Sequence, residues 1–483
     1  MLPIMNRFHI VFLFCIIHIL TIRSFSANNN QYKQVEDSLR AQVESSRLNK
    51  NSLGLVVADE SGEIIYQLNA EKKFSPASLM KIITAAAVLE KLPIGHQFLT
   101  HLMGREDQIS EGVLKGNLYI KGGGDASFVS ESLWFLVNEF TRAQIKEISG
   151  DIVVDDTRFD RVRFDESRDQ SRVDRAYDAP IGAMTFNWSA INVFVRPAKK
   201  KGEPAIVFAD PENNYVKIVN KAKTIAKGST SLTVHHRGLA TDKRSETIEV
   251  IGSIPLSAAE FVAYKSVVQP EIWAGENLKS FLQQRGVAVR GQVVSGSTPS
   301  GTKVLATYKS RPVSDSVSGL LKFSNNYIAE ILTKNLAAEL GSGPATMAGG
   351  IAEIKKYLKQ KNLDDIAFVN PSGLSRNNQV RPFDLLKILQ ELQANFKIFP
   401  EYLSGFPISG VDGTLKGRLR QNMGAVRAKT GHLSGVAGLG GYVSTQKHKI
   451  YPFIFIHNGS ADDSYRAKSL FDNLLEILAK SDK

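Results

Sequence analysis

Cysteine is almost absent from this sequence. The single cysteine among 483 residues is Cys15, inside the apolar N-terminal segment. A chain that loses this segment has no thiol. Its fold does not depend on a disulfide, and it has no cysteine that an oxidising compartment could oxidise. The scarcity excludes a disulfide-stapled fold and suits the periplasm or the cell exterior.

Long hydrophobic stretches are also scarce. Phe8–Ile22 is almost continuously apolar, follows Arg7, and precedes the small residues of Ser24-Phe25-Ser26. This order is typical of a secretory signal peptide. We expect cleavage after Ser26, which places the mature chain in the periplasm, and a retained membrane anchor is the alternative. No later stretch is long and apolar enough to span a membrane, so no integral span is expected after cleavage.

Signatures of several other chemistries are missing. The nine histidines are scattered without an HExxH pattern, so we expect no metal and no cofactor. The absence of GxSxG argues against an α/β-hydrolase. The formal net charge of +12 fits a polyanionic partner. Basic residues are not interleaved with aromatic ones as in single-strand binders, and no nucleic-acid partner is expected.

Hydrophobic periodicity divides the chain into three regions with different predicted secondary structure. Leu53–Leu68 alternates around Glu60-Ser61-Gly62, which predicts a hairpin, and the apolar run Leu79–Leu89 predicts a buried helix. Short β-rich segments dominate from about residue 96 to 300. Helical patterns dominate from Ser316 to Gln393, and strands followed by an amphipathic helix at about 466–480 close the chain. We expect the apolar stripe of that last helix to pack on the core rather than on a membrane.

One pair of polar residues opens the apolar helix. Ser78-Leu79-Met80-Lys81 places a hydroxyl and an amine three positions apart, on one helix face, with Cβ atoms roughly 5–6 Å apart. Apolar surroundings disfavour the charged form of a lysine and lower its pKa. A neutral Lys81 could accept the proton of Ser78, and the helix N-terminus favours negative charge there. We therefore predict that Ser78 is a nucleophile and Lys81 its base.

The same SxxK spacing occurs twice more, so the pattern alone is weak. Ser300-Gly301-Thr302-Lys303 lies in a Gly/Ser/Thr-rich stretch that predicts a loop. Ser444-Thr445-Gln446-Lys447 lies between two expected strands, as an exposed turn. Neither is followed by an apolar helix, and this context selects Ser78.

A second motif, Ser324-Asn325-Asn326, precedes the expected helix Tyr327–Leu340. A serine and an amide at such a turn can relay a proton and hold a substrate amide. The alternative is an ordinary helix N-cap, which Ser and Asn also provide. The SxN spacing recurs at Ser375-Arg376-Asn377, so this motif is weak by itself.

A third motif, Lys429-Thr430-Gly431-His432, lies in an expected edge strand. Lys and Thr there can hold a substrate carboxylate, and Gly lets another backbone approach closely. The alternative is a solvated strand with an ordinary turn.

Together and in this order, the three motifs resemble the signature set of penicillin-binding proteins and serine β-lactamases. Between Lys81 and Ser324 lie 242 residues, a long insertion that resembles the D-alanyl-D-alanine carboxypeptidase/endopeptidase family of penicillin-binding protein 4 type. Further similar segments lie along nearly the whole mature chain: Pro76-Ala77, Gly112–Leu118 leading into Gly122-Gly123-Gly124-Asp125, Pro180–Met184 and Gly410–Leu415.

The resemblance implies an α/β (α+β) transpeptidase-like domain, with an antiparallel sheet flanked by helices and an inserted β-rich region of one or two small domains. The expected limits are a signal peptide at 1–26, a discontinuous serine D,D-peptidase domain at 27–95 and 285–483, an inserted β-rich domain at 96–195 and 251–284, and a third small domain nested at 196–250.

The resemblance also implies a serine D,D-carboxypeptidase and D,D-endopeptidase that cleaves peptidoglycan stem peptides through an acyl-serine. β-Lactams would act as covalent inhibitors, and a homodimer is an option. The implied catalytic residues are Ser78 as nucleophile, Lys81 as base, Ser324 and Lys429 as the proton route to the leaving amine, and Asn326 on the acyl side. The implied substrate-binding residues are Thr430, Gly431 and His432, with the N–H groups of Ser78 and His432 as the oxyanion hole.

One loop departs from the family pattern. Asn370-Pro371-Ser372-Gly373-Leu374-Ser375-Arg376 has Asn-Pro where the family has Asp-Gly, which bears on the conformation of the loop and on substrate choice. Two rival functions are a serine β-lactamase-like hydrolase, which would turn over penicillin rapidly, and a wall-binding scaffold that has lost catalysis. The three intact motifs count against the scaffold.

Overall fold

The computed structural model describes residues 32–168, 179–240, 244–341 and 344–481. The expected signal peptide and Cys15 lie outside this part of the chain. Within the described residues, no helix combines the length and the apolar character that a bilayer crossing requires.

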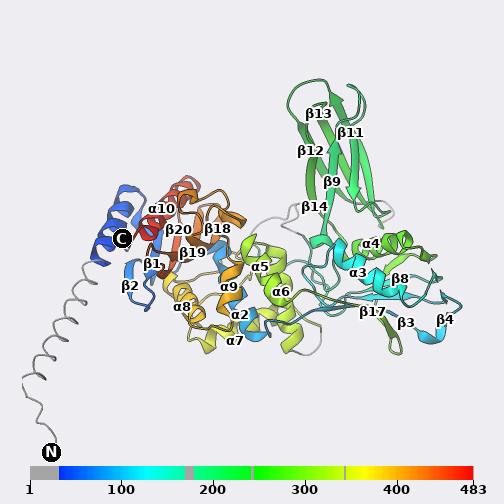
Figure 1. The fold of residues 1–483 in the computed structure, drawn as a ribbon, viewed down its shortest axis with the longest axis horizontal. Coiled ribbons are helices and arrows are strands. Elements are labelled where there is room, and N and C mark those ends of the chain that lie inside the picture. Colours follow the sequence, from blue (N-terminus) through cyan, green and yellow to red (C-terminus); the bar gives the residue numbers. More distant parts are fainter. Residues whose placement is uncertain (1–31, 169–178, 241–243, 342–343, 482–483) are drawn as a thin grey trace, which may run out of the picture.

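A five-stranded antiparallel sheet joins the two ends of the described chain (Figure 1). The hairpin expected over Leu53–Leu68 is present, and its first strand pairs with the last strand of the protein, with Leu55 opposite Phe455. The strand order is β18-β19-β20-β1-β2. The bounds are β1 Leu53–Ala58, β2 Ile64–Leu68, β18 Val426–Leu433, β19 Val436–Ser444 and β20 Ile450–Asn458.

Helices cover both faces of this sheet because its strands are apolar on both sides. On one face lie α10 (Ala461–Ala479) and a helix over residues 32–45. The other face carries α2 (Met80–Lys91) and α8 (Pro382–Gln393). The prediction that the last helix packs on the core is confirmed, since its apolar stripe is buried: Leu470, Phe471, Leu474, Leu475 and Leu478.

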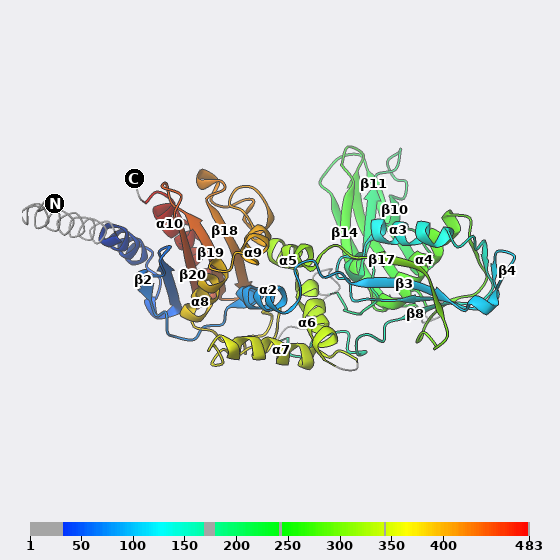
Figure 2. The same ribbon diagram turned by 60° about the horizontal axis from the view of Figure 1, so that its bottom comes forward.

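Helix α2 is the centre of the catalytic region. Every residue from Met80 to Leu89 is buried, as the apolar run predicts. The helix packs on α8, and further helices enclose it on its other sides (Figure 2). They are α5 Val313–Lys322, α6 Asn326–Leu340, α7 Met347–Gln360 and α9 Phe399–Gly405. A polar group on α2 is therefore held in an apolar environment.

The β-rich insertion forms the other half of the molecule (Figure 1). A five-stranded sheet of order β16-β8-β6-β3-β17 is covered by α3 (Ser130–Thr141) and α4 (Pro270–Gln284). Its strands are β3 Leu99–Gly104, β6 Leu118–Lys121, β8 Ile152–Asp155, β16 Val293–Ser295 and β17 Lys303–Lys309. A small sheet beside it contains β4 Ile109–Ser110, β5 Val113–Leu114, β7 Glu147–Ile148 and β15 Ala288–Val289.

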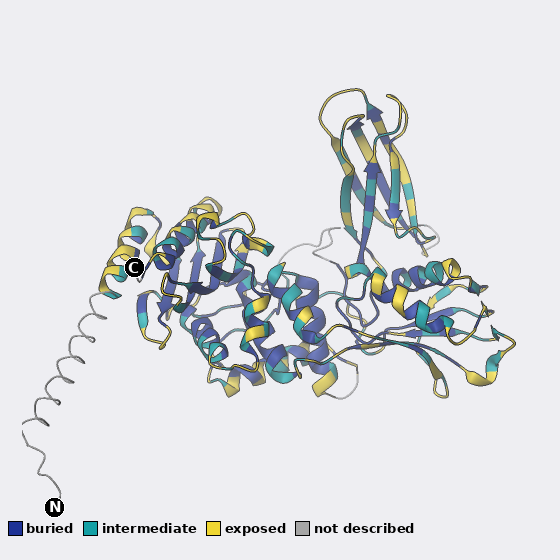
Figure 3. Cartoon of the chain, viewed as in Figure 1, coloured by how far each residue is buried: buried dark blue, intermediate teal, exposed yellow. Residues whose placement is uncertain are grey.

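Two three-stranded sheets rise from the insertion as a separate lobe (Figures 1 and 3). Their orders are β10-β9-β14 and β11-β13-β12. We propose that this lobe is the nested third domain expected around 196–250, with β9 and β14 as its base. The strands are β9 Ala190–Arg196, β10 Ile206–Asp210, β11 Val216–Ile225, β12 Ser231–Leu239, β13 Glu246–Pro255 and β14 Phe261–Ser266.

The packing of α10 predicts the effect of a truncation. Leu474→Ala removes a fully buried side chain and leaves a cavity between α10 and the sheet, so the free energy of unfolding should fall by about 2–5 kcal/mol. Urea unfolding followed by circular dichroism measures this loss. Ser469→Ala, at an exposed position of the same helix, serves as the control, and an equal loss in both variants would contradict the assigned packing.

Candidate active site

Ser78 lies in a tight turn at the start of the buried helix. The turn is the 3-10 segment η2, Ala77–Leu79, which leads directly into α2. Ala77 and Leu79 are buried, whereas Ser78 is partly exposed. The Leu79 N–H donates to the Pro76 carbonyl at 3.1 Å, and Ala77 has a positive φ of 48°. The turn therefore anchors its flanking residues and leaves the Ser78 hydroxyl accessible.

Lys81 is fully buried in the first turn of α2. Its Nζ lies 3.1 Å from Ser78 Oγ, 2.7 Å from Asn326 Oδ1 and 2.5 Å from the Ser372 carbonyl oxygen. A neutral amine has two N–H donors and one lone pair. The two carbonyl-type oxygens can accept both N–H bonds of a neutral amine, which leaves its lone pair for Ser78 Oγ, whereas a protonated Lys81 donates to all three oxygens. The geometry therefore brings Lys81 Nζ close enough to Ser78 Oγ to exchange a proton with it.

Burial and a like charge both hold the pKa of Lys81 well below its usual range. Desolvation is the larger cause, and the charge of Lys429 adds to it. The carboxylate of Glu330 opposes the shift, and Arg168, whose Nε donates to Glu330 Oε1 at 3.0 Å, partly cancels that carboxylate. The shift is in the direction that the neutral base predicted from the sequence requires.

The three side chains of the Ser324-Asn325-Asn326 turn have different hydrogen-bond partners. Asn325 is the N-cap of α6, because its Oδ1 accepts from the Ile328 N–H at 3.2 Å. Ser324 has a positive φ of 56° and bonds to Lys429, while Asn326 bonds to Lys81. The ordinary capping role thus falls on the middle residue and leaves the outer two for the site.

Lys429 is buried on the edge strand β18. Its Nζ donates to Ser324 Oγ at 2.7 Å and to the Thr430 carbonyl at 2.6 Å. Burial lowers the pKa of Lys429 to about 7, so its charge depends on pH near neutrality. Lys429 and Ser324 can therefore pass a proton between the lysine Nζ and the serine hydroxyl.

The rest of β18 faces the Ser78 turn at close range. A Cβ on Gly431 would lie 2.9 Å from the Pro76 carbonyl, closer than side chains tolerate, so only glycine permits this approach. The Thr430 hydroxyl donates to that of Thr414 at 2.8 Å, and His432 is exposed. The structure therefore brings the three sequence motifs to one place.

The loop at residue 370 supplies an oxygen that sequence motifs did not reveal. The Ser372 carbonyl accepts from Lys81 and lies 3.4 Å from Ser78 Oγ. Asn370 Oδ1 fixes this loop by accepting from the N–H groups of Ser372 and Leu374, both at 3.0 Å, and from the Ser372 hydroxyl at 2.7 Å. Gly373 has a φ of +85° and lies against Ala77, which leaves no room for a side chain.

The asparagine at position 370, where the family has an aspartate, is explained by its contacts with the inserted region. The Asn370 amide donates to Asp165 Oδ2 at 2.7 Å and to Ser167 Oγ at 3.3 Å. A carboxylate at position 370 would accept the same loop bonds but would face Asp165 with a like charge. The inserted segment 165–168 therefore reaches both the loop and, through Arg168, the buried Glu330 of α6. No sequence motif predicts these contacts, because the residues of the segment 165–168 can be recognised only by what lies next to them in the folded protein.

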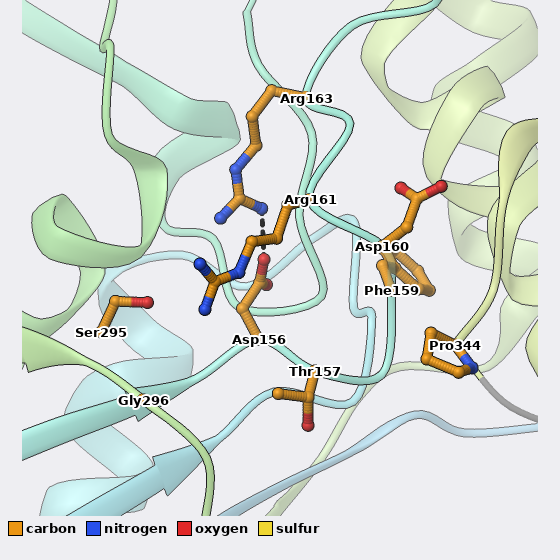
Figure 4. A pocket seen from close by; sticks show the side chains of 9 residues that line it. All are labelled: Asp156, Thr157, Phe159, Asp160, Arg161, Arg163, Ser295, Gly296 and Pro344. Carbon is orange, nitrogen blue, oxygen red and sulfur yellow. Dashed lines mark hydrogen bonds and ion pairs between the residues drawn. The ribbon is translucent and has the colours of Figure 1, made fainter.

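A separate pocket lies away from these residues. Figure 4 shows this cavity of about 300 Å³, where Arg163 points at Asp156 and the two form an ion pair, with Phe159 and Pro344 nearby. None of the site residues lines it. Across the described residues, no group of three or more His, Cys, Asp or Glu side chains is arranged to hold a metal ion.

A serine beside a buried lysine, between an edge strand and a helix-capping SxN turn, is the arrangement shared by penicillin-binding proteins and serine β-lactamases. The family model of D-Ala-D-Ala carboxypeptidase 3 (S13) matches residues 35–480, and this chain belongs to that family. It is a serine-type D-alanyl-D-alanine carboxypeptidase, so the predicted family and enzyme class are confirmed. This membership favours the peptidase over the β-lactamase-like alternative.

Relatives along almost the full chain support this membership. A D-alanyl-D-alanine carboxypeptidase of Actinomadura sp. (strain R39) is 32% identical over 90% of this chain and 82% of its own length. The carboxypeptidase DacB of Haemophilus influenzae is 26% identical, over 84% of this chain and 85% of its own. The crystal structure of penicillin-binding protein 4 (dacB) from H. influenzae has a TM-score of 0.73 at 24% identity and covers 88% of this chain and 96% of its own. This likeness confirms the predicted fold class.

The electrostatic coupling of the two lysines predicts a pH effect. Lys429→Gln removes a positive charge that lowers the pKa of Lys81, so the pKa of Lys81 should rise. Less of the neutral base is then present at a given pH, and the acidic limb of the pH profile for penicillin acylation should move to higher pH. Lys429→Arg carries a charge at every pH, including above about 7 where Lys429 loses its own, so its limb should not move to higher pH. A limb that stays in place in Lys429→Gln would contradict the coupling.

The bonds of Asn370 predict that it positions the Ser372 carbonyl. Asn370→Ala leaves the N–H groups of Ser372 and Leu374 without their acceptor, at a cost of about 1–3 kcal/mol each. We expect the rate of Ser78 acylation to fall by about tenfold or more. Asn377→Ala, an exposed asparagine in the same loop, should acylate at the unaltered rate. Equal rates in both variants would contradict the positioning role.

Proposed function

We propose that Ser78 is the nucleophile and Lys81 the general base of this D,D-peptidase. The observation that carries the proposal is the 3.1 Å distance between Lys81 Nζ and Ser78 Oγ, in a buried environment that lowers the pKa of Lys81. A deprotonated Lys81 needs no further activation before it accepts the serine proton.

Acylation begins when Ser78 Oγ attacks the carbonyl carbon between two D-alanines while Lys81 takes the hydroxyl proton. The N–H groups of Ser78 and His432 stabilise the oxyanion, where each preorganised donor contributes about 3–4 kcal/mol. Asn326 holds the amide on the acyl side of the substrate. Its link to Lys81 at 2.7 Å couples substrate position to the base.

The leaving amine requires a proton before the C–N bond breaks. Ser324 donates it and recovers a proton from Lys429, whose Nζ lies 2.7 Å away. Lys429 and Thr430 hold the terminal carboxylate of the substrate, and Gly431 lets the strand come close enough to do so. Lys81 then returns its proton through water to Lys429, which restores the starting protonation state of both lysines. Water attacks the acyl carbonyl while the neutral Lys81 takes a proton from it. That proton passes to Ser78 Oγ as the ester bond breaks, which regenerates Ser78 and releases the shortened peptide.

The substrates we propose are peptidoglycan stem peptides, at their D-Ala-D-Ala ends and at D,D-crosslinks. A crosslink presents the same D-alanyl carbonyl with a larger leaving amine, so one site can serve both reactions. A β-lactam presents a strained acyl group in the same position and acylates Ser78. These substrates place the protein in the periplasm after removal of residues 1–26. Light scattering over a range of protein concentrations measures the molar mass in solution and decides whether the protein is a homodimer.

Covalent labelling tests the assignment of the nucleophile. Intact mass spectrometry after incubation with benzylpenicillin should show one adduct, and peptide mapping should place it on Ser78. Ser78→Ala should abolish the adduct, whereas Ser300→Ala, in the second SxxK sequence, should retain it. An adduct on another residue, or an adduct in Ser78→Ala, would refute the proposal. Hydrolysis of the adduct within seconds would instead support the β-lactamase-like alternative.

A further inference from the structure

An extended groove starts at Ser324, and Ser78 does not line it. A cavity of about 680 Å³ is lined by Ser324 and Asn325 on one side and by residues of the insertion on the other. A second cavity of about 920 Å³ continues from it toward Arg311 and Glu401. The two cavities share four lining residues, Val129, Glu131, Trp188 and Phe323, and so form one groove. Its walls are contributed by α3, α5, α9, the turn before α6 and the strands β9, β10, β14 and β17. Figure 1 labels α3, α5, α9, β9, β14 and β17.

Three aromatic side chains are unusually exposed along this groove. Phe323, directly before Ser324, is 70% exposed, Tyr264 is 58% exposed and Trp188 is 45% exposed. Large aromatic side chains normally bury most of their surface, and a cluster of exposed ones marks a binding surface. Their flat faces suit the apolar face of a sugar ring or the side chains of a peptide.

Trp188 is held there by a strained turn. Asn187, Trp188 and Ser189 have φ values of 47°, 54° and 52°, a run of left-handed residues that is unfavourable without glycine. The turn is fixed on both sides: the Asn187 N–H donates to the Phe128 carbonyl at 3.0 Å, and the Val267 N–H donates to the Ser189 carbonyl at 2.9 Å. Such a conformation persists only where the surroundings impose it, and here it presents Trp188 to the groove.

The same turn is connected to the helix of the active site. Thr185, two residues before Asn187, hydrogen-bonds to the hydroxyl of Tyr327, the residue that follows Asn326. The position of Trp188 is therefore fixed relative to the catalytic turn. A ligand bound on Trp188 would be held in register with Ser324.

The polar residues of the groove suit a ligand that is rich in hydroxyl and amide groups. Asp210, Glu131 and Asn192 line the part next to Ser324, and serine hydroxyls together with Arg311, Asp315 and Glu401 line the remainder. Carboxylates accept hydrogen bonds from sugar hydroxyls and from peptide N–H groups. This mixture of aromatic faces and oxygen acceptors resembles the lining of specific small-ligand sites.

The place of Ser324 in the proposed mechanism determines which part of the substrate enters the groove. Ser324 delivers the proton to the leaving amine, so a groove that begins at Ser324 lies on the leaving-group side. A released D-alanine is a small molecule and needs no groove of this length. The leaving half of a D,D-crosslink carries a whole stem peptide and its amino sugar.

We propose that this groove binds the leaving strand of a D,D-crosslinked peptidoglycan substrate, with Trp188 and Phe323 stacking on its stem peptide and amino sugar. The inference rests on the proposed function, and it assigns part of the inserted region to the recognition of crosslinks. The groove thereby favours endopeptidase cleavage over the trimming of free stems.

The test compares two substrates in the full-length protein. One is a D,D-crosslinked disaccharide-peptide dimer, and the other is the matching monomeric pentapeptide. The ratio of kcat/KM for dimer over monomer should fall about tenfold in Trp188→Ala and in Phe323→Ala. Trp134→Ala removes another tryptophan that is 56% exposed, outside both cavities, and should keep the ratio of the unaltered protein.

Two results would overturn the inference. If both substrates lose activity in parallel, the aromatic residues act only through the general integrity of the site. If the unaltered protein trims the monomer but does not cleave the dimer, the groove has no crosslink to bind. In that case a penicillin adduct on Ser78 still upholds the nucleophile and the carboxypeptidase reaction of the proposed function, whereas absence of the adduct would refute the function itself.

Discussion

The desolvation of one amine underlies the organisation of this protein. Lys81 is buried on a helix that is apolar on every side, so its charged form is disfavoured and its pKa is low. A buried amine without partners would be costly, and the Asn326 amide and the Ser372 carbonyl offset that cost by accepting its two N–H bonds. Lys81 Nζ lies 3.1 Å from Ser78 Oγ. The mechanism that we propose depends on this arrangement, because a neutral Lys81 can accept the serine proton.

Distant parts of the chain are needed to build this environment. The sheet brings the two ends of the chain together, α6 supplies Asn326, the 370 loop supplies an oxygen, and β18 supplies a second lysine whose charge further lowers the pKa of the first. The insertion contributes as well, since Asp165 and Arg168 contact Asn370 and Glu330. The inserted region is therefore part of the surroundings of the catalytic centre as well as a wall of the groove.

The sequence predicted those features that side-chain patterns encode. The apolar run after Ser78 specified a buried helix, alternation specified the hairpin Leu53–Leu68, and the order of three motifs specified the family. Features made by the backbone left no such pattern. A carbonyl oxygen such as that of Ser372 has no residue signature, and the left-handed turn at Trp188 lacks the glycine that usually marks one. The contacts of Asn370 depended on an insertion about 200 residues away, which periodicity cannot place.

The protonation state of Lys81 is the most direct test of this account. Nitrogen-detected or methyl-tagged NMR titration of the lysine side chains, with the Lys81 signal assigned through its loss in Lys81→Met, gives its pKa in the folded protein. We predict a value far below that of the exposed lysines, with Lys81 neutral at the pH at which penicillin acylates the protein. A Lys81 that titrates with the exposed lysines, near the usual pKa of about 10.4, would contradict the neutral base and the mechanism built on it.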